Sequence, residues 1–214
     1  MTPDHPTWLP VPSPNKHSGR NPKWPVNGLV IHFTAAGSGK GTADYFSKRE
    51  VSWVEAGVTK TAKVSASAHL TIDRDGTVYQ SVNFADRAWH AGPATLWKGA
   101  KTPTNVNDFT IGIEIANWGQ LLTSNNGYLN YLKKPYKGPA PFLSTKDGSY
   151  WEPYPEAQVN AVIQATKIII SKFPAITRAD VTGHENIQSN KKDPGPAWPW
   201  EHFLDSVFGD DDEQ

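Results

Sequence analysis

Three side chains in this sequence have the types and the spacing of a hydrolytic metal site. His32 ends a short apolar segment, and His184 is followed nine residues later by Asp193 in a loop stiffened by Pro194 and Gly195. Two imidazoles and one carboxylate are ligands that Zn²⁺ accepts, and they leave its fourth tetrahedral position open for water. An open position is typical of catalytic rather than structural zinc, so these residues indicate a zinc hydrolase.

Short strands are expected to position these ligands. Residues 28–33 form an apolar run in which His32 alternates with its apolar neighbours. Residues 110–115 form a second such run, with isoleucines on one face and Gly112 and Glu114 on the other. We therefore expect the histidine and the glutamate to lie where a sheet face opens to a groove.

A hairpin and two helices are the other elements that the sequence predicts. Asp75-Gly76 lies between two β-rich runs within residues 69–82, which is a strong hairpin signal. Apolar residues recur every three to four positions over 155–173 and predict the main helix, and a shorter helix is expected over 42–50 with Thr42 as its N-cap. Strands interspersed with helices predict an α/β (α+β) fold, with a mixed central β-sheet flanked by helices.

The length and the even composition predict a single domain of 214 residues. We expect an irregular N-terminal arm over 1–26, the folded domain over 27–208 and an acidic, disordered tail over 209–214. Residues 118–153 have many Gly, Pro, Asn and aromatic side chains without a clear period, which indicates a long surface insertion. Its aromatic residues either widen a glycan-binding groove or only pack the insertion onto the domain.

Composition excludes several classes of function. The absence of cysteine rules out thiolate metal sites, disulfides and cysteine nucleophiles. The 21 basic and 21 acidic residues balance, so we expect no nucleic-acid partner. No apolar run approaches the length of a membrane span, and the first residues do not resemble a signal peptide. We therefore expect a protein that is made and kept in the cytoplasm unless something else releases it, and that has no stable membrane association. We also expect a monomer.

Five segments of the chain, taken together and in order, match one pattern. They are the strand ending at His32, Ser67-Ala68-His69 with Ile72 to Gln80, Ala88-Trp89-His90-Ala91-Gly92, Asn107 to Glu114, and Gly183-His184 with Lys191 to Gly195. With these segments the chain resembles the zinc-dependent N-acetylmuramoyl-L-alanine amidases of the amidase-2 type, which are relatives of the peptidoglycan recognition proteins. The resemblance covers roughly residues 27–204 and leaves out the arm, the insertion and the tail.

The resemblance implies hydrolysis of the amide between the lactyl group of N-acetylmuramic acid and L-alanine, the first residue of the peptidoglycan stem peptide. It also implies a mixed sheet flanked by helices, with zinc in a groove on one sheet face. Carried over by position, His32, His184 and Asp193 would be the zinc ligands. Glu114 would be the catalytic carboxylate, and Lys191 the catalytic lysine.

The chemistry of amide hydrolysis agrees with these roles. Zinc would lower the pKa of its bound water and polarise the carbonyl. Glu114 would move a proton from that water to the departing nitrogen, and Lys191 would stabilise the oxyanion. Counting forward from His184 favours Lys192 instead, so the adjacent lysine stays an alternative. Some relatives carry a catalytic tyrosine where this chain has Ala68, which leaves more of the proton transfer to Glu114.

Four further residues are candidates for substrate binding. Trp89 would either stack on a sugar or stem peptide or be buried. For His90, a groove-wall or structural role is favoured over a role as a ligand. Asn107 would either bind the stem peptide or organise the turn before the 110–115 strand. His69 would lie near the metal or bind backbone groups in the sheet, and a supporting role is favoured.

Two rival functions and two biological settings stay open. A non-catalytic peptidoglycan-binding module would be expected to lack a metal ligand, whereas all three candidates are present. A glycosidase that uses Glu114 and Asp193 would leave the histidines unexplained. For the amidase, a phage-type endolysin is favoured over a cytoplasmic enzyme that recycles anhydro-muropeptides, because of the insertion, the aromatic residues and the lack of an export signal.

Overall fold

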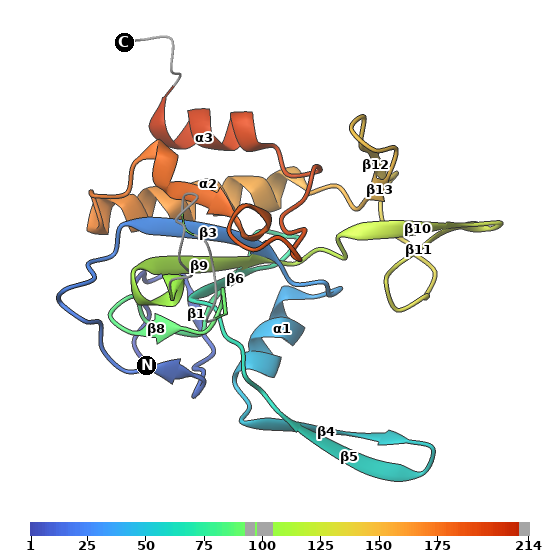
Figure 1. Cartoon of the computed structure of the whole chain (residues 1–214), viewed down its shortest axis with the longest axis horizontal. Coiled ribbons are helices and arrows are strands. Elements are labelled where there is room, and N and C mark those ends of the chain that lie inside the picture. The colour runs from blue at the N-terminus through green and yellow to red at the C-terminus, as the bar shows by residue number, and fades with distance from the viewer. Residues whose placement is uncertain (93–96, 98–104, 210–214) are drawn as a thin grey trace.

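A six-stranded mixed sheet forms the centre of the computed structural model of this chain (Figure 1). The structure describes residues 1–92, 97 and 105–209, so the predicted acidic tail beyond Gly209 lies outside the described residues. The strands are β1 Leu9–Pro10, β3 Gly28–Phe33, β6 Leu70–Ile72, β7 Val78–Gln80, β9 Thr110–Ile115 and β14 Val181–Gly183. Their order is β1-β7-β6-β9-β3-β14, and the β6–β7 pair is antiparallel while the other neighbours run parallel.

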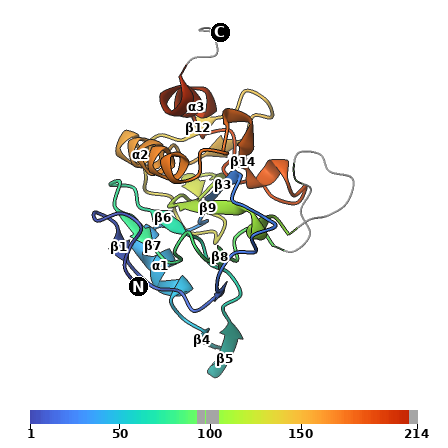
Figure 2. The same cartoon turned by 90° about the vertical axis from the view of Figure 1, so that its left-hand side faces the viewer.

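Helices cover both faces of this sheet, as Figure 2 shows. α2 (Glu156–Lys172) and α3 (Trp200–Phe208) lie on one side, and α1 (Gly39–Phe46) lies on the other. On the α2 side, Ile113 of β9 and Val162 of α2 are fully buried in the main hydrophobic core. The predicted mixed sheet flanked by helices is therefore confirmed.

Several elements agree with the sequence prediction. β3 and β9 have the predicted bounds, and β6 and β7 form the hairpin around Asp75-Gly76. α2 fills the predicted range 155–173, with Pro155 at its N-cap and Phe173 at its C-cap. Proline suits the start of a helix because its fixed φ is compatible with the first turn and no N–H is needed there.

α1 starts earlier and is shorter than the helix predicted over 42–50. Ser38 is its N-cap, because the Ser38 hydroxyl accepts a hydrogen bond from Gly41 N at 3.1 Å. Thr42 instead lies inside the first turn, where its hydroxyl donates to the Ser38 carbonyl. The helix ends at Phe46, and the chain beyond it turns into a strand.

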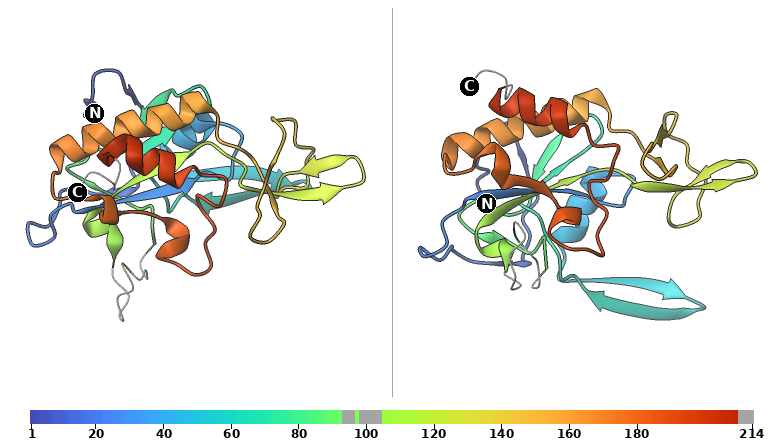
Figure 3. Two further views of the ribbon diagram at one scale, coloured as in Figure 1. Left: turned by 90° about the horizontal axis from the view of Figure 1, so that it is seen from above. Right: turned by 45° about the horizontal axis from the view of Figure 1, so that its top comes forward.

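A second hairpin, which the sequence analysis did not predict, projects from the body of the molecule (Figure 3). Its strands β4 (Glu50–Glu55) and β5 (Val58–Lys63) form a two-stranded sheet of their own. The connecting residues Ala56 and Gly57 have φ of 51° and 78°. Positive φ at both positions is the requirement of a type I′ turn, so the glycine was an available signal.

Residues 118–153 fold as a small four-stranded sheet of order β11-β10-β13-β12, which extends from one end of the domain (Figure 3). Arg74 fixes this insertion to the body, because its Nε and Nη2 donate to the buried Glu152 carboxylate at 2.9 and 2.7 Å. The strands are β10 Gln120–Ser124, β11 Gly127–Leu129, β12 Phe142–Leu143 and β13 Tyr150–Trp151.

The N-terminal residues 1–26 run along the domain. β2 (Lys16–His17) pairs with β8 (Arg87–Ala88), and Trp8 is buried against Phe84. None of the helices in the described ranges is long and apolar enough to cross a membrane. Short 3₁₀ helices lie at η2 Val106–Asp108, η3 Arg178–Asp180 and η4 His184–Asn186.

Candidate active site

Strands β3 and β9 place His32 beside Glu114. The register of this parallel pair sets His32 opposite Glu114 and Val30 opposite Gly112. Residues in register on neighbouring strands point to the same face, so both side chains project from the sheet face opposite the α2 core. His32 is only 1% exposed, and the site is therefore built on a rigid, buried part of the sheet.

Three ligand-type atoms converge next to β3. The Nδ1 atoms of His32 and His184 are 3.0 Å apart, and Asp193 Oδ2 lies 2.9 Å from the first and 3.0 Å from the second. His184 begins η4 directly after β14, the strand that pairs with β3. The carbonyl of Asp193 accepts from Glu185 N at 3.0 Å, which holds the Asp193 loop against η4.

The protonation states of this cluster suit a cation. Burial lowers the pKa of His32, so its imidazole is neutral at pH 7. Burial opposes the ionisation of Asp193, but hydrogen bonds with His184 and His32 outweigh it and hold the pKa of the carboxyl well below its usual range. Neutral imidazole and ionised carboxylate are the forms that bind a metal.

The three residues fit a tetrahedral ion with one open position. Their ligand atoms all lie within 4.8 Å of one another, and all three residues are buried. Two atoms bound at about 2.0–2.1 Å to a tetrahedral ion are about 3.3 Å apart, close to the spacing seen here. Gln188 Oε1 lies 3.0 Å from His184 Nε2, and the other ring nitrogen of His184, Nδ1, faces Asp193 Oδ2. A proton on Nε2 would therefore be donated to Gln188 and would leave Nδ1 as the ligand atom.

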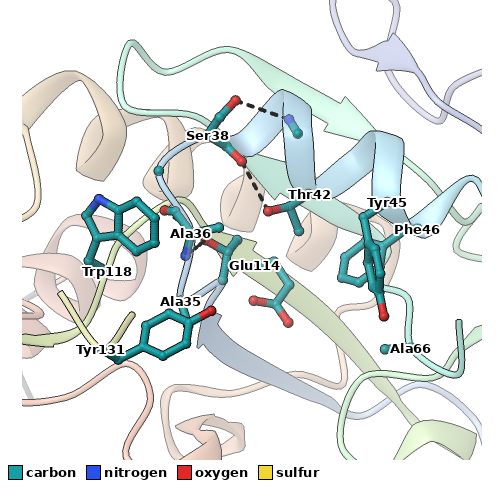
Figure 4. Close-up of a pocket in the computed structure, with 13 residues that line it drawn as sticks. Ala35, Ala36, Ser38, Thr42, Tyr45, Phe46, Ala66, Glu114, Trp118 and Tyr131 are labelled. Carbon is teal, nitrogen blue, oxygen red and sulfur yellow. Dashed lines mark hydrogen bonds between the residues drawn. The ribbon is translucent and has the colours of Figure 1, made fainter. Parts of the chain in front are cut away.

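Glu114 lines a cavity of about 590 Å³ between α1 and the insertion. In Figure 4 its carboxylate points into this cavity, with Trp118 and Tyr131 on one side and Tyr45 on the other. Trp118 and Tyr131 belong to residues 118–153, so the insertion forms one wall of the site. Glu114 is the only carboxylate among the residues that line this cavity, and aromatic side chains form much of its wall.

The environment of Glu114 favours its protonated form. Burial, and then the negative charge of Asp193, raise the pKa of Glu114 well above its usual range, while the positive charge of Lys191 opposes them. Its Oε2 is buried with no hydrogen-bond partner in the part of the chain that the structure describes. A carboxyl group of raised pKa is suited to take up and release a proton near neutral pH.

The geometry distinguishes the two adjacent lysines. Lys191 lines a second cavity of about 400 Å³ together with His184, and its charge acts on Glu114. Lys192 instead donates from Nζ to Gln120 Oε1 at 2.8 Å, which ties it to strand β10 of the insertion. Lys191, the first choice of the sequence analysis, therefore lies at the cavity that His184 lines, whereas Lys192 is bound to the insertion.

Replacing these lysines separately tests that choice. Lys191→Ala is expected to reduce turnover about 10²- to 10³-fold, since a donor to the developing oxyanion is lost. Lys192→Ala serves as the matched control and is expected to leave turnover near the wild-type value. The measurement is the steady-state rate of each purified variant on one muropeptide, and an inactive Lys192→Ala beside an active Lys191→Ala would reverse the assignment.

The residues predicted to bind substrate fall into two groups. Trp89, His90 and Asn107 line the second cavity, where Trp89 Nε1 donates to His17 Nδ1 at 2.9 Å. Asn107 Oδ1 accepts from the backbone N–H groups of residues 90 and 91, so its carbonyl end organises this loop. His69 is fully buried, and its Nδ1 accepts from the Gly112 N–H at 3.0 Å.

His90 also contacts the metal-ligand cluster. Its Nδ1 lies 3.0 Å from His32 Nε2, and the residue is 8% exposed. Burial, and then the neighbouring His32, lower the pKa of His90 well below its usual range, so this ring is neutral. The sequence analysis favoured a groove-wall or structural role for His90 over a role as a ligand.

Two residues of the site were absent from the sequence analysis. Gln188 follows His184 by four residues, the spacing that brings side chains together in a helical turn, and this was a usable signal. Tyr45 lies on α1 and inside the helix predicted over 42–50, but no motif in the sequence marked it as a site residue.

Comparison with known proteins decides the family. A family model described as N-acetylmuramoyl-L-alanine amidase matches residues 22–196. The chain belongs to this amidase family. It is an N-acetylmuramoyl-L-alanine amidase, a hydrolase of peptidoglycan catabolism, and the resemblance stated from the five sequence segments is confirmed.

Individual relatives agree with this family. The 1,6-anhydro-N-acetylmuramyl-L-alanine amidase AmpD of Haemophilus influenzae is 29% identical over 202 residues, which are 92% of this chain and 90% of the relative. A crystal structure of AmpD matches 97% of this chain and 99% of its own, with 26% identity and a TM-score of 0.59. The amidase AmiD from Escherichia coli, solved with anhydro-N-acetylmuramic acid-L-Ala-D-gamma-Glu-L-Lys, matches 87% of this chain and 60% of its own, with 26% identity and a TM-score of 0.59.

Proposed function

We propose that this amidase uses zinc, held by His32, His184 and Asp193, to hydrolyse the amide between the muramyl group and L-alanine in soluble anhydro-muropeptides. The observation that carries the substrate class is the Haemophilus influenzae relative, an amidase of the 1,6-anhydro-muramyl group by name, which aligns with 92% of this chain. The substrate bound to AmiD belongs to the same class. These relatives favour the cytoplasmic recycling setting over the phage-type endolysin that the sequence analysis preferred.

The geometry supports a separate chemical role for each of the site residues. Zinc, when bound, supplies a Lewis acid that polarises the amide carbonyl and eases deprotonation of the attacking water. Glu114 takes the proton of that water and returns it to the nitrogen of L-alanine as the C–N bond breaks. Lys191 stabilises the negative charge on the carbonyl oxygen. The products are a muramyl carboxylate and a stem peptide with a free amino terminus.

The two cavities support binding on both sides of the reacting amide. One contains Glu114 and is walled by aromatic residues of α1 and the insertion, and the other contains Lys191, Trp89 and Asn107. Tyr131 of the insertion faces Glu114, which supports a role of residues 118–153 in substrate binding beyond packing. Aromatic faces suit the apolar faces of a sugar ring, whereas the polar second cavity suits peptide amide and carboxylate groups.

Rates on two substrates test the proposed setting. We expect faster hydrolysis per muramyl–alanine bond with soluble anhydro-muropeptides than with intact sacculi, because the relative that aligns with 92% of this chain is an amidase of the 1,6-anhydro-muramyl group. Products are identified by mass spectrometry at matched bond concentrations. Faster hydrolysis of sacculi would overturn the recycling proposal in favour of a lysin.

The same assay, with and without EDTA, tests the metal. Chelation is expected to stop the release of stem peptides, and added zinc is expected to restore it. New reducing ends that persist in EDTA would indicate a glycosidase instead. Binding to sacculi without any product would indicate a non-catalytic module.

A further inference from the structure

The cavity that contains Glu114 suits an uncharged part of the substrate. Among the described residues that line it, none is a lysine or an arginine, and Glu114 is the only acid. A carboxylate of the stem peptide would lie there without a cation to neutralise it, which costs free energy inside a protein. Lys191 instead lines the second cavity. The charges therefore favour the sugar of the substrate in the first cavity and the peptide in the second.

Trp118 forms the wall of the first cavity on the side of the insertion. Its ring centroid is 6.2 Å from that of Tyr131, and both rings lie on the same side of the Glu114 carboxylate in Figure 4. Aromatic rings bind well to apolar faces and leave polar groups at the edge of a ligand free for water or hydrogen bonds. Trp118 is therefore placed to contact one face of a sugar ring.

Packing of the insertion onto the domain does not explain this position of Trp118. Another tryptophan of the insertion, Trp151, is 4% exposed and lies against Phe33 of β3, so it is the one that packs. Trp118 is only half-buried and remains accessible from the cavity. An aromatic ring that is held at a cavity wall without being covered is available to a ligand.

Gly37 provides the space in which the Trp118 indole lies. A Cβ atom at residue 37 would be 2.8 Å from Cζ2 of Trp118, so any larger residue would displace the ring. Gly37 is not one of the glycines with a positive φ. The backbone conformation at this position therefore does not require glycine, whereas the close approach of the indole does.

The buried Arg74–Glu152 ion pair fixes the backbone on both sides of this contact. Arg74 Nη1 donates to the carbonyl of Gly37 at 2.6 Å. Glu152 Oε2 accepts from the backbone N–H of Trp118 at 2.5 Å, and Glu152 is 3% exposed. Because one ion pair bonds to the glycine and to the tryptophan, it sets the position of each relative to the other.

We propose that the muramyl ring of the substrate packs on Trp118, and that Gly37, Arg74 and Glu152 are positioning residues that hold the indole at the cavity wall. This inference rests on the proposed function and adds to it a specificity-determining residue for the sugar. Trp118 would favour a stem peptide that carries the sugar over the same peptide that carries only a lactyl group.

The first test compares two substrates that differ only in the sugar. One is 1,6-anhydro-N-acetylmuramic acid joined to L-Ala-D-γ-Glu-L-Lys, and the other is the same tripeptide acylated with lactic acid. We expect Trp118→Ala to lower kcat/KM about 3- to 10-fold on the first substrate and to leave the second unchanged. An equal loss on both substrates, or no loss on either, would overturn the proposal.

Trp53→Ala is the matched control for that test. Trp53 is an exposed tryptophan on the β4–β5 hairpin, and it is not among the residues that line either cavity. Its removal is expected to change kcat/KM on neither substrate. A selective loss with Trp53→Ala as large as that with Trp118→Ala would show that the effect does not depend on the cavity wall, and would reject the proposal.

The second test concerns the positioning residues. Gly37→Ala is expected to produce the same selective loss on the muramyl substrate, because the added methyl group displaces the indole. Arg74→Lys keeps the charge but loses the planar fork that reaches two partners, and a smaller selective loss is expected. Neither change should add to the loss in a Trp118→Ala background. Losses that add in full would show that Gly37 and Arg74 act independently of Trp118.

A binding measurement separates this inference from the proposed function. In ¹H–¹⁵N NMR spectra, 1,6-anhydro-N-acetylmuramic acid alone is expected to shift the indole N–H signal that is missing from the spectrum of Trp118→Ala. If the wild type cleaved neither substrate, the proposed function would fail, while this shift would still support the sugar contact. Cleavage of both substrates without the shift and without a selective loss would leave the amidase standing and reject the role of Trp118.

Discussion

Glu114→Gln is expected to reduce turnover about 10²- to 10⁴-fold while zinc content stays at the wild-type level. The side-chain amide of glutamine has the size of the glutamate carboxyl group but cannot take up and release a proton. The substitution therefore removes proton transfer and leaves the position otherwise unchanged. The measurement is kcat on a soluble muropeptide, with bound zinc determined by elemental analysis of the same sample. A variant that keeps near-normal kcat with full zinc would show that another group moves the proton.

The same substitution is expected to make the metal-free protein more stable at neutral pH. Burial raises the pKa of Glu114 in the folded state, so its ionisation above the unfolded value of 4.5 costs the native state free energy. Stability is thus lost as pH rises through the raised folded pKa, and glutamine escapes this loss. Thermal unfolding of both proteins should show an advantage for the variant at pH 7 that disappears near pH 4.5.

Asp193→Asn is expected to weaken zinc binding by more than about 100-fold, since removal of a direct ligand exceeds the loss of an outer partner. Activity at limiting zinc should fall with it. Chelator competition measures the affinity, and Glu185→Gln, which alters a carboxylate in the same segment outside the proposed ligand set, is the control. If Asp193→Asn kept the zinc affinity and the activity of the wild type, Asp193 would be removed from the ligand set.

Neutralising Asp193 has the opposite effect on stability to neutralising Glu114. Hydrogen bonds with two histidines hold its folded pKa below the unfolded value of 3.8, so the ionised form stabilises the native state above that pH. This contribution is lost as pH falls through the folded pKa. Metal-free Asp193→Asn should therefore unfold at a lower temperature than wild type at pH 7, with the difference shrinking below pH 3.8.

The elements that carry the ligands were predictable because their patterns are local. β3 and β9 alternate strictly between core and groove residues, and α2 repeats its apolar face over several turns before Pro174. The proposed ligands themselves were chosen by residue type within a known family pattern. Their convergence agrees with that pattern, because β3 and β14 are neighbours in the sheet.

Other features depend on contacts that the sequence does not display. Ser38 and Thr42 are both acceptable helix caps by residue type. The helix starts after Ser38, where the Asp73 carboxylate also accepts a hydrogen bond from the N–H of Lys40 at 3.0 Å, in the first turn. The β4–β5 hairpin lacks a buried face, so no alternation of polar and apolar residues marked it. The contact between His32 and His90 joins two separate segments and appears only in the folded protein.

The placement of His184 directly after a short edge strand links metal release to local unfolding. β14 has three residues and pairs with β3 at one edge of the sheet, so few hydrogen bonds keep it in place. When β14 separates from β3, His184 moves away from His32, and a metal shared by the two loses a ligand. By mass action, a bound metal must in turn oppose that separation. The ion would thus hold an early strand and the last quarter of the chain together. The metal-free enzyme would be the form most exposed to proteases at this edge.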